Sequence, residues 1–380
     1  MTTGSLQTKG GKYYAVVCFN VDGQQTQKWI NTGYTVVGNK KRAEQFLKQK
    51  IEEFDEVKDV QETKLLFCDF LNDWLEIHRA NVEAITYAGY KRILKQVYPY
   101  FKKLNVSLVE LTPMQIHKYY ALKLKSVSPN SVLKHHALIR TALEYAKKMR
   151  MVKENVADLV EKPKKQKFVG SFYNQDEICR LLEVMKGSVI EAPLMFAVYF
   201  GLRRSEIVGV KWKAIDFVNR TLTINHKVVP VNDDGTYRLD ASNTLKTSSS
   251  YRAMPLDDSF YNYLIGLKEQ QDSNKGLFRS SYNPKYSEYV CVNAIGNLLM
   301  PNYVTRQFKQ LLLKNGMRVI RFHDLRHSCA SLLLHLGYSM KDIQLWLGHG
   351  DIGTTMNIYA HIDPSNKINM VNGIAKALKI

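Results

Sequence analysis

The alternation of hydrophobic and polar residues near the start of the chain predicts a small β-sheet at residues 12–37. The runs KYYAVVCFNV and QTQKWINTG are rich in β-branched and aromatic residues, and Asp22-Gly23 between them is typical of a hairpin turn. Asn39 then precedes a helical pattern at residues 40–54. We expect a three-stranded sheet with one helix, a unit too small to be an enzyme by itself.

From residue 64 onward the apolar positions recur at helical spacing. Segments 65–78 and 86–104 each carry one apolar face. Two further helices are expected after Thr112 and Ser128, because each of these capping residues is followed by a proline at the first helical position. The pattern predicts an all-α domain of four helices.

The stretch EKPKKQKFVGS is polar and basic and contains both proline and glycine, so we interpret it as an interdomain linker. Beyond it, Asn174 and Glu177 form a capping box, an apolar helix ends in FGLRRSEIVGVKW, and strands are expected at 220–229 and 251–256. This last part is predicted to be an α+β, mainly helical domain. The predicted division is 1–63, 64–160, a linker at 161–171, and 172–380.

The composition is typical of a soluble globular protein. The chain has 380 residues, 45% of them hydrophobic, with neither an apolar run long enough to span a membrane nor a signal-peptide core. We therefore expect a cytoplasmic protein. The five cysteines are scattered and show no CxxC pairing, which argues against disulfides and structural zinc and favours buried free thiols.

The charge is more informative than the composition. A net charge of +19 indicates a polyanionic partner, DNA or RNA, although basicity that serves only solubility is the alternative. The N-terminal unit offers Lys12, Lys28, Lys40 and Lys41 to phosphates, unless it only packs on its neighbour. The helical domain is expected to expose a larger basic set: Lys91, Arg92, Lys95, Lys102, Lys103, Lys134, Lys147, Lys148 and Arg150.

Six polar residues of types that take part in catalysis are spread over the last domain. The helix in HDLRHSCASLLLHLG has an apolar stripe, yet it begins with four crowded polar residues. Similar polar residues occur in GLRRSE, in TLKTSSSYRAMPL, in WLGHGD and in TTMNIYAH. The candidates are Arg203, Lys246, His323, Arg326, His349 and Tyr359.

In order and in approximate spacing, this set resembles the catalytic signature of the tyrosine recombinases, the phage integrase family. The motifs GLRRSE, HDLRHS, LGH and IYAH carry the resemblance. More weakly, the β-rich unit and the helical domain resemble the arm-binding and core-binding domains of integrases of phages and integrative elements. The resemblance implies a site-specific recombinase that joins two DNA sites through a Holliday junction and integrates and excises a mobile element.

Transesterification of a phosphodiester explains these residue types. Tyr359 is the expected nucleophile, and Arg203 with Arg326 supplies forked, permanently charged donors for the phosphate. Lys246 is the candidate general acid for the leaving 5′ oxygen. His323 would orient or deprotonate Tyr359, and His349 would donate a hydrogen bond to the phosphate. Because two guanidiniums can supply the charge of a metal ion, we expect no cofactor and no metal.

Several alternatives stay open at this level. Arg204 competes with Arg203, Lys227 competes with Lys246, and His349 has the alternative of a helix cap. We expect Asp324 and His327 to brace their helix, with Glu206 a candidate to hold one of the two arginines. The competing functions are a type IB topoisomerase, a chromosome-dimer resolvase and a non-enzymatic DNA-binding regulator; the first two have no need of a separate N-terminal unit, and the third would lack part of the catalytic set.

The C-terminal segment HIDPSNKINMVNGIAKALKI has a break at Pro364 followed by apolar residues at helical spacing. This terminal helix either packs on its own domain or, as the resemblance implies, is donated to a neighbouring protomer in a homotetramer on DNA. Double-stranded DNA with core and arm sites is the expected partner. A directionality factor and a host DNA-bending protein are further candidate partners.

Overall fold

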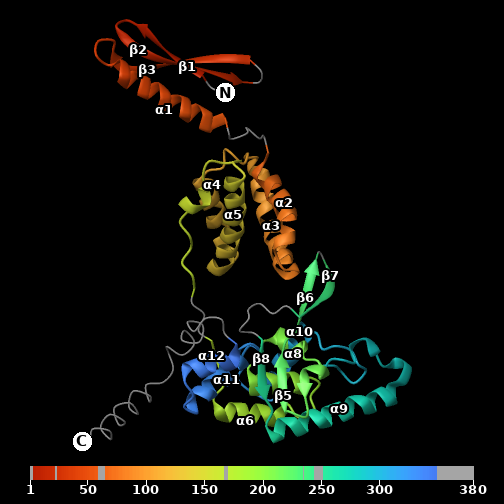
Figure 1. Cartoon of the computed structure of the whole chain (residues 1–380). Helices are drawn as coiled ribbons and strands as arrows, with labels where there is room; N and C mark the ends of the chain where they lie inside the picture. Colours follow the sequence, from red (N-terminus) through yellow and green to blue (C-terminus); the bar gives the residue numbers. More distant parts are fainter. Residues whose placement is uncertain are drawn as a thin grey trace, which may run out of the picture. The chain divides into compact units, whose positions relative to one another are not determined.

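The computed structural model describes residues 3–21, 24–58, 65–166, 170–233, 235–243 and 251–348. The chain separates into two compact units, Met1–Gln166 and Lys167–Ile380, which we describe one at a time (Figure 1). Among the helices in the described ranges, none is long and apolar enough to cross a membrane.

The chain begins with an antiparallel sheet of order β1-β2-β3, covered by the helix α1 (Figure 1). Its elements are β1 (Thr3–Lys9), β2 (Lys12–Val21), β3 (Gln24–Thr35) and α1 (Lys40–Lys58). The predicted start of the sheet at residue 12 is wrong, because β1 is polar and almost wholly exposed and pairs through its backbone. Gly4 packs under α1, where a Cβ would lie 2.9 Å from Leu47.

Four helices form the helical domain, as the sequence predicts: α2 (Phe67–His78), α3 (Ala84–Leu104), α4 (Pro113–Leu124) and α5 (Pro129–Lys148). Thr112 and Ser128 cap α4 and α5 through their side chains, and each is followed by proline. Two buried tyrosine–histidine pairs join these helices: the Tyr119 hydroxyl lies 2.8 Å from Nδ1 of His135, and the Tyr120 hydroxyl lies 3.0 Å from Nδ1 of His136.

In the second unit, helices surround a small sheet of order β4-β5-β8, and the hairpin β6-β7 projects from the body of the unit (Figure 1). The strands are β4 (Ile215–Asp216), β5 (Thr221–Ile224), β6 (Lys227–Asp233), β7 (Thr236–Ser242) and β8 (Arg252–Pro255). The strands predicted around 220–229 are present, and the segment divides at Asn225-His226 into β5 and β6, which lie in different sheets.

The α-helices of this unit form its apolar core with the sheet. They are α6 (Gln175–Val184), α7 (Glu191–Phe200), α8 (Arg204–Val208), α9 (Asp258–Phe278), α10 (Pro301–Lys314), α11 (Asp324–His335) and α12 (Met340–Leu347). The predicted Asn174–Glu177 capping box is confirmed at the start of α6. The cysteines are all free thiols; Cys68, Cys291 and Cys329 are buried, whereas Cys179 is exposed, contrary to expectation.

The apolar helix predicted to continue through GLRRSE ends earlier. It stops at Phe200, and Gly201 takes the left-handed conformation at φ 58° that commonly terminates helices. Arg203 then has extended backbone angles and caps a new short helix, α8. Gly201 also has no room for a side chain, because a Cβ would lie 2.5 Å from Leu347.

Candidate active site

Arg203 lies at the break between α7 and α8, where it is the N-cap residue of α8. Its Nη1 donates to Oε1 of Glu206 at 2.6 Å, and its Nη2 donates to the Gly348 carbonyl at 2.8 Å. Arg204 instead donates to the Thr305 hydroxyl at 2.7 Å. The two neighbouring arginines are thus distinguished: Arg203 joins the cluster described below, and Arg204 bonds to α10.

Glu206 is the buried anion of this cluster, with 3% of its surface exposed. It accepts a hydrogen bond from Arg203, as the sequence suggested, and a second guanidinium, that of Arg252, lies 3.2 Å from its Oε2. Burial alone would raise the pKa of Glu206, but Arg252 and Arg203 offset this effect and hold the pKa below its ordinary value. Glu206 is therefore ionised at neutral pH.

Arg326 lies in the first turn of α11 and is 2% exposed. Its Nη1 donates to the Gly201 carbonyl at 2.7 Å, and its Nη2 donates to the Leu347 carbonyl at 2.6 Å. Burial, followed by the nearby charge of Arg203, lowers the pKa of Arg326 to about 9, so the guanidinium stays protonated at neutral pH. The planar guanidinium of Arg326 thereby links the end of α7 to the end of α12.

The C-terminus of α12 brings Arg203 and Arg326 together. Leu347 and Gly348 offer successive carbonyls, one to each guanidinium. The end of a helix carries partial negative charge, which favours cations at this position. Gly348 turns the chain at φ 68° directly before His349. The two arginines therefore share one positively charged place at the C-terminus of α12.

His323 is the residue immediately before α11. The surrounding protein keeps water from part of its ring, and this desolvation, with the nearby His327 and Arg326, lowers the pKa of His323 to about 4. The residue is nevertheless open to solvent on one side. His323 is neutral at pH 7 and reachable from outside, as a residue that handles a proton must be.

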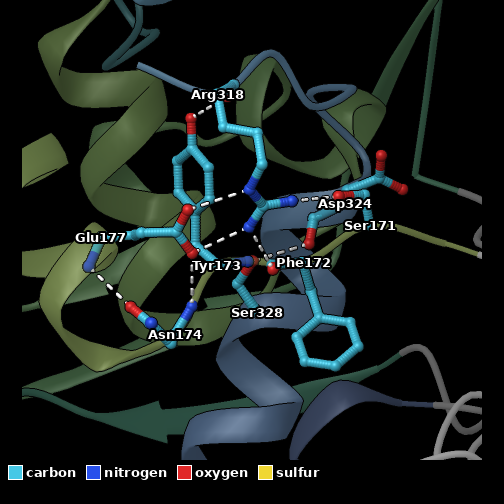
Figure 2. A network of polar contacts seen from close by, with 8 residues as sticks. All are labelled: Ser171, Phe172, Tyr173, Asn174, Glu177, Arg318, Asp324 and Ser328. Atoms are coloured by element: carbon cyan, nitrogen blue, oxygen red, sulfur yellow. Dashed lines mark hydrogen bonds and ion pairs between the residues drawn. The ribbon is translucent and has the colours of Figure 1, made fainter.

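A polar network fixes the start of α11 (Figure 2). The Ser328 hydroxyl accepts from the backbone N–H of Tyr173 at 2.9 Å and donates to the Asp324 carbonyl at 3.0 Å. Arg318 donates to both carboxylate oxygens of Glu177, at 2.9 and 2.8 Å, and to the Phe172 carbonyl at 2.7 Å. Tyr173, near the start of the second unit, is thus hydrogen-bonded to α11, the helix that carries Arg326.

The expectation that Asp324 braces its helix is confirmed. Its carboxylate accepts from the backbone N–H of Arg321 at 2.9 Å and from the guanidinium of the same residue at 2.6 Å. The ring of His327 packs edge-on against that of His323, with centroids 5.3 Å apart. Both residues therefore support the start of α11.

Three of the six predicted site residues, Lys246, His349 and Tyr359, lie outside the described residues, as does the C-terminal segment 361–380. The strands on either side of Lys246 are described. The Tyr251 hydroxyl donates to the Asn243 carbonyl, which links the two residues that flank the segment 244–250. Arg252 follows at the start of β8 and reaches Glu206. The segment that contains Lys246 is therefore followed closely in the chain by a member of the arginine cluster.

Arg252 is the member of the cluster that sequence reasoning missed, because YRAMPL was interpreted only as a strand. A signal was present. Arg252 and the buried Met254 occupy alternate positions of β8 and so face the same side of the sheet. An arginine on the core-facing side of a strand requires a buried anionic partner. Glu206, already a candidate to hold an arginine, was a carboxylate that could be this partner.

Comparison with known proteins assigns the chain to a family. The phage integrase family matches residues 171–366, and its N-terminal SAM-like domain matches residues 66–124. The chain is 25% identical to a tyrosine recombinase XerC-like protein of Caldanaerobacter subterraneus, over 96% of each chain. It is 23% identical to the ICEBs1 integrase of Bacillus subtilis, over 96% of this chain and 97% of the relative.

Solved structures share the fold. The Tn1549 transposon integrase in complex with a circular intermediate DNA matches with a TM-score of 0.64 and 18% identity, over 82% of this chain and 100% of that one. A lambda integrase tetramer bound to a Holliday junction matches with a TM-score of 0.56 and 16% identity, over 91% and 95% of the two chains. With the family match and the arginine cluster, the conclusion is that the chain belongs to the phage integrase family and is a tyrosine recombinase, an enzyme of site-specific DNA recombination.

Proposed function

We propose that Arg203 and Arg326 bind the scissile phosphate while Tyr359 attacks it. The observation that carries this proposal is the convergence of both guanidiniums on the Leu347–Gly348 turn directly before His349. Two cations held by backbone carbonyls are preorganised, so they can stabilise the added charge of a pentacoordinate phosphorus without rearranging. His349 follows that turn in the chain, which supports a role as a third donor to the phosphate.

In the proposed cleavage step, the Tyr359 oxygen forms a bond to phosphorus as the bond from phosphorus to the 5′ oxygen breaks. His323, neutral at pH 7, accepts or orients the tyrosine proton, and Lys246 gives a proton to the departing 5′ oxygen. The product is a 3′-phosphotyrosyl link. Attack by the 5′ hydroxyl of another strand reverses the step and needs no external energy source.

The biological reaction that this chemistry serves is, we propose, integration and excision of a mobile element. The ICEBs1 integrase and the integrase of Staphylococcus phage L54a are relatives whose names support this assignment. The N-terminal sheet supports it too, since a separate unit that binds accessory arm sites is useful for choosing element ends. A chromosome-dimer resolvase is the competing assignment, favoured by the likeness to the XerC-like protein.

We propose that the active assembly is a homotetramer on two core sites, held together by exchange of segment 361–380. The lambda integrase tetramer on a Holliday junction has the same fold and supports this arrangement. Removing residues 366–380 should then abolish synapsis while leaving the thermal midpoint of the monomer unchanged. Ultracentrifugation on DNA decides between this arrangement and a tail packed within one chain, for which tetramers would persist or melting would occur early.

The test of the overall reaction uses the full chain with DNA carrying the two ends of its own element. Recombinant product and a Holliday-junction intermediate are expected when two sites are present. Relaxation of a supercoiled circle that has no such site would instead favour the topoisomerase alternative. Replacing Lys12 and Lys28, both exposed on β2 and β3, by glutamate should weaken binding to accessory repeats and leave core-site cleavage unchanged.

A further inference from the structure

The arginine at the start of β8 has no role in the reaction described so far. Arg252 is buried, with 8% of its side chain exposed, and its Nη2 lies 3.2 Å from Oε2 of Glu206. It faces the interior with Met254 on the same side of the strand. Burying a guanidinium is costly unless its charge is compensated, so the position of Arg252 is defined by Glu206.

The Glu206 carboxylate is shared between two arginines. Its Oε1 accepts from Nη1 of Arg203 at 2.6 Å, while its Oε2 accepts from the backbone N–H of Arg203 at 3.0 Å and lies beside Arg252. Arg326 feels the charges of all three groups. Two guanidiniums therefore contact one carboxylate, a third lies near enough to feel its charge, and these four groups together carry two net positive charges.

We propose that Arg252 is a positioning residue for strand cleavage: as the second cation on the Glu206 carboxylate, it balances that buried charge, so that Arg203 keeps its geometry and net positive charge remains for the phosphate. This inference rests on the role of Arg203 proposed above. Without Arg252, the buried carboxylate has one fewer cation to balance it, and Arg203 alone must compensate its charge. The phosphate site then loses net positive charge, and Arg203 loses its position.

A second role for Arg252 makes a different prediction. Arg252 follows the segment 244–250 in the chain, so its ion pair also anchors the start of β8, the strand after Lys246. If anchoring β8 were its main contribution, its loss would impair protonation of the leaving oxygen by Lys246. A 5′-bridging phosphorothiolate substrate separates the two roles, because its sulfur leaves without a proton.

The experiment compares full-length Arg252→Gln and Arg252→Lys with Arg204→Gln in single-turnover cleavage of a suicide substrate. Arg204 is the matched control, because it is the adjacent arginine and bonds to Thr305 on α10. We expect Arg252→Gln to slow cleavage by roughly 10- to 100-fold with DNA affinity unchanged, a loss typical of a misplaced phosphate donor. The phosphorothiolate should not rescue it. Arg252→Lys, which keeps the charge, should lose less than about tenfold, and Arg204→Gln should cleave normally.

A double variant tests whether the effect passes through the carboxylate. If it does, Arg252→Gln in a Glu206→Gln background causes no further loss, because no buried carboxylate charge is left to balance. The double variant also lacks the buried Glu206 charge that Arg252→Gln leaves unbalanced. It can therefore be used for the test if the thermal midpoint of Arg252→Gln shows that this single variant folds poorly.

Three outcomes would overturn the inference: normal cleavage by Arg252→Gln, full rescue of that variant by the phosphorothiolate, or losses that multiply in the double variant. None of these affects the proposed function, which fails only if changes at Arg326 or Tyr359 also leave cleavage normal.

Discussion

Arg203 and Arg326, 123 positions apart in the numbering of the chain, donate hydrogen bonds to the adjacent carbonyls of Gly348 and Leu347, at 2.8 and 2.6 Å. The end of one short helix thus sets the relation between the two cations. Both guanidiniums are held by backbone carbonyls of the protein itself. The account of the active site rests on this relationship.

The first prediction is that lysine cannot replace arginine at position 326. A single ammonium cannot reproduce the fork that spans the Gly201 and Leu347 carbonyls. Arg326→Lys should slow cleavage by about 10²- to 10³-fold with core-site affinity unchanged, as measured by single-turnover kinetics and gel shift. Arg180→Lys is the control, since Arg180 is exposed on α6 and donates to the Asn315 carbonyl. Near-normal cleavage by Arg326→Lys would rule out a bidentate role.

The second prediction separates Lys246 from Lys227. If Lys246 protonates the leaving oxygen, Lys246→Ala should cleave ordinary DNA slowly and recover most of its rate on a 5′-bridging phosphorothiolate. Lys227→Ala should behave like the parent protein on both substrates. Arg326→Ala, which lacks a phosphate donor, should not recover. Equal recovery of the Lys246 and Arg326 variants would remove the assignment of Lys246 as the acid.

The third prediction concerns the network of Figure 2. Ser328→Ala removes the acceptor of the buried Tyr173 N–H, which costs about 1–3 kcal/mol of stability. For a unit of this size the thermal midpoint should fall by roughly 2–4 °C per kcal/mol. Ser188→Ala is the matched control, because the buried Ser188 hydroxyl has no hydrogen-bond partner among the described residues. Equal midpoints for the two variants would contradict a role of Ser328 in fixing α11.

The fourth prediction is an acid sensitivity of the helical domain. Desolvation, with the nearby charge of Lys123, lowers the pKa of His135 to about 4. Because its pKa in the unfolded chain is about 6.5, the unfolded state binds the proton first as the pH falls. Stability should therefore decline from about pH 6.5 and level off near pH 4, by about 3 kcal/mol in total.

His135→Asn offers a neutral group near the Tyr119 hydroxyl and should flatten this decline, as measured by urea unfolding between pH 7 and pH 4. His117→Asn, at an exposed position of α4, is the matched control and should keep the slope of the parent protein. An unchanged slope in His135→Asn would mean that other groups cause the decline.

Helix starts were predictable from the sequence because their signals are local. Thr112-Pro113, Ser128-Pro129 and the box of Asn174 with Glu177 each satisfy free backbone N–H groups within one turn. Arg203 and Arg326 were proposed as site residues through the order of motifs, since neither position alone distinguishes a catalytic arginine from a solvated one.

The features that the sequence did not reveal differ in their reasons. β1 has no hydrophobic alternation and exists through backbone pairing with β2, the next strand in the chain. The end of α7 at Gly201 was overlooked, although a glycine after an apolar helix is a local stop signal. Arg252 faces the core on β8, and its pairing with Glu206 follows from the fold, which brings two distant segments together.

The most direct test of the central claim is to trap the covalent intermediate and find the residue that carries it. The full chain is incubated with a suicide substrate bearing an end of its own element, and the adduct is digested and mapped by mass spectrometry. The account predicts a 3′-phosphotyrosyl link on Tyr359, and a Tyr359→Phe variant that binds the same DNA with unchanged affinity but forms no adduct. An adduct on any other residue, or an adduct formed by Tyr359→Phe, would contradict it.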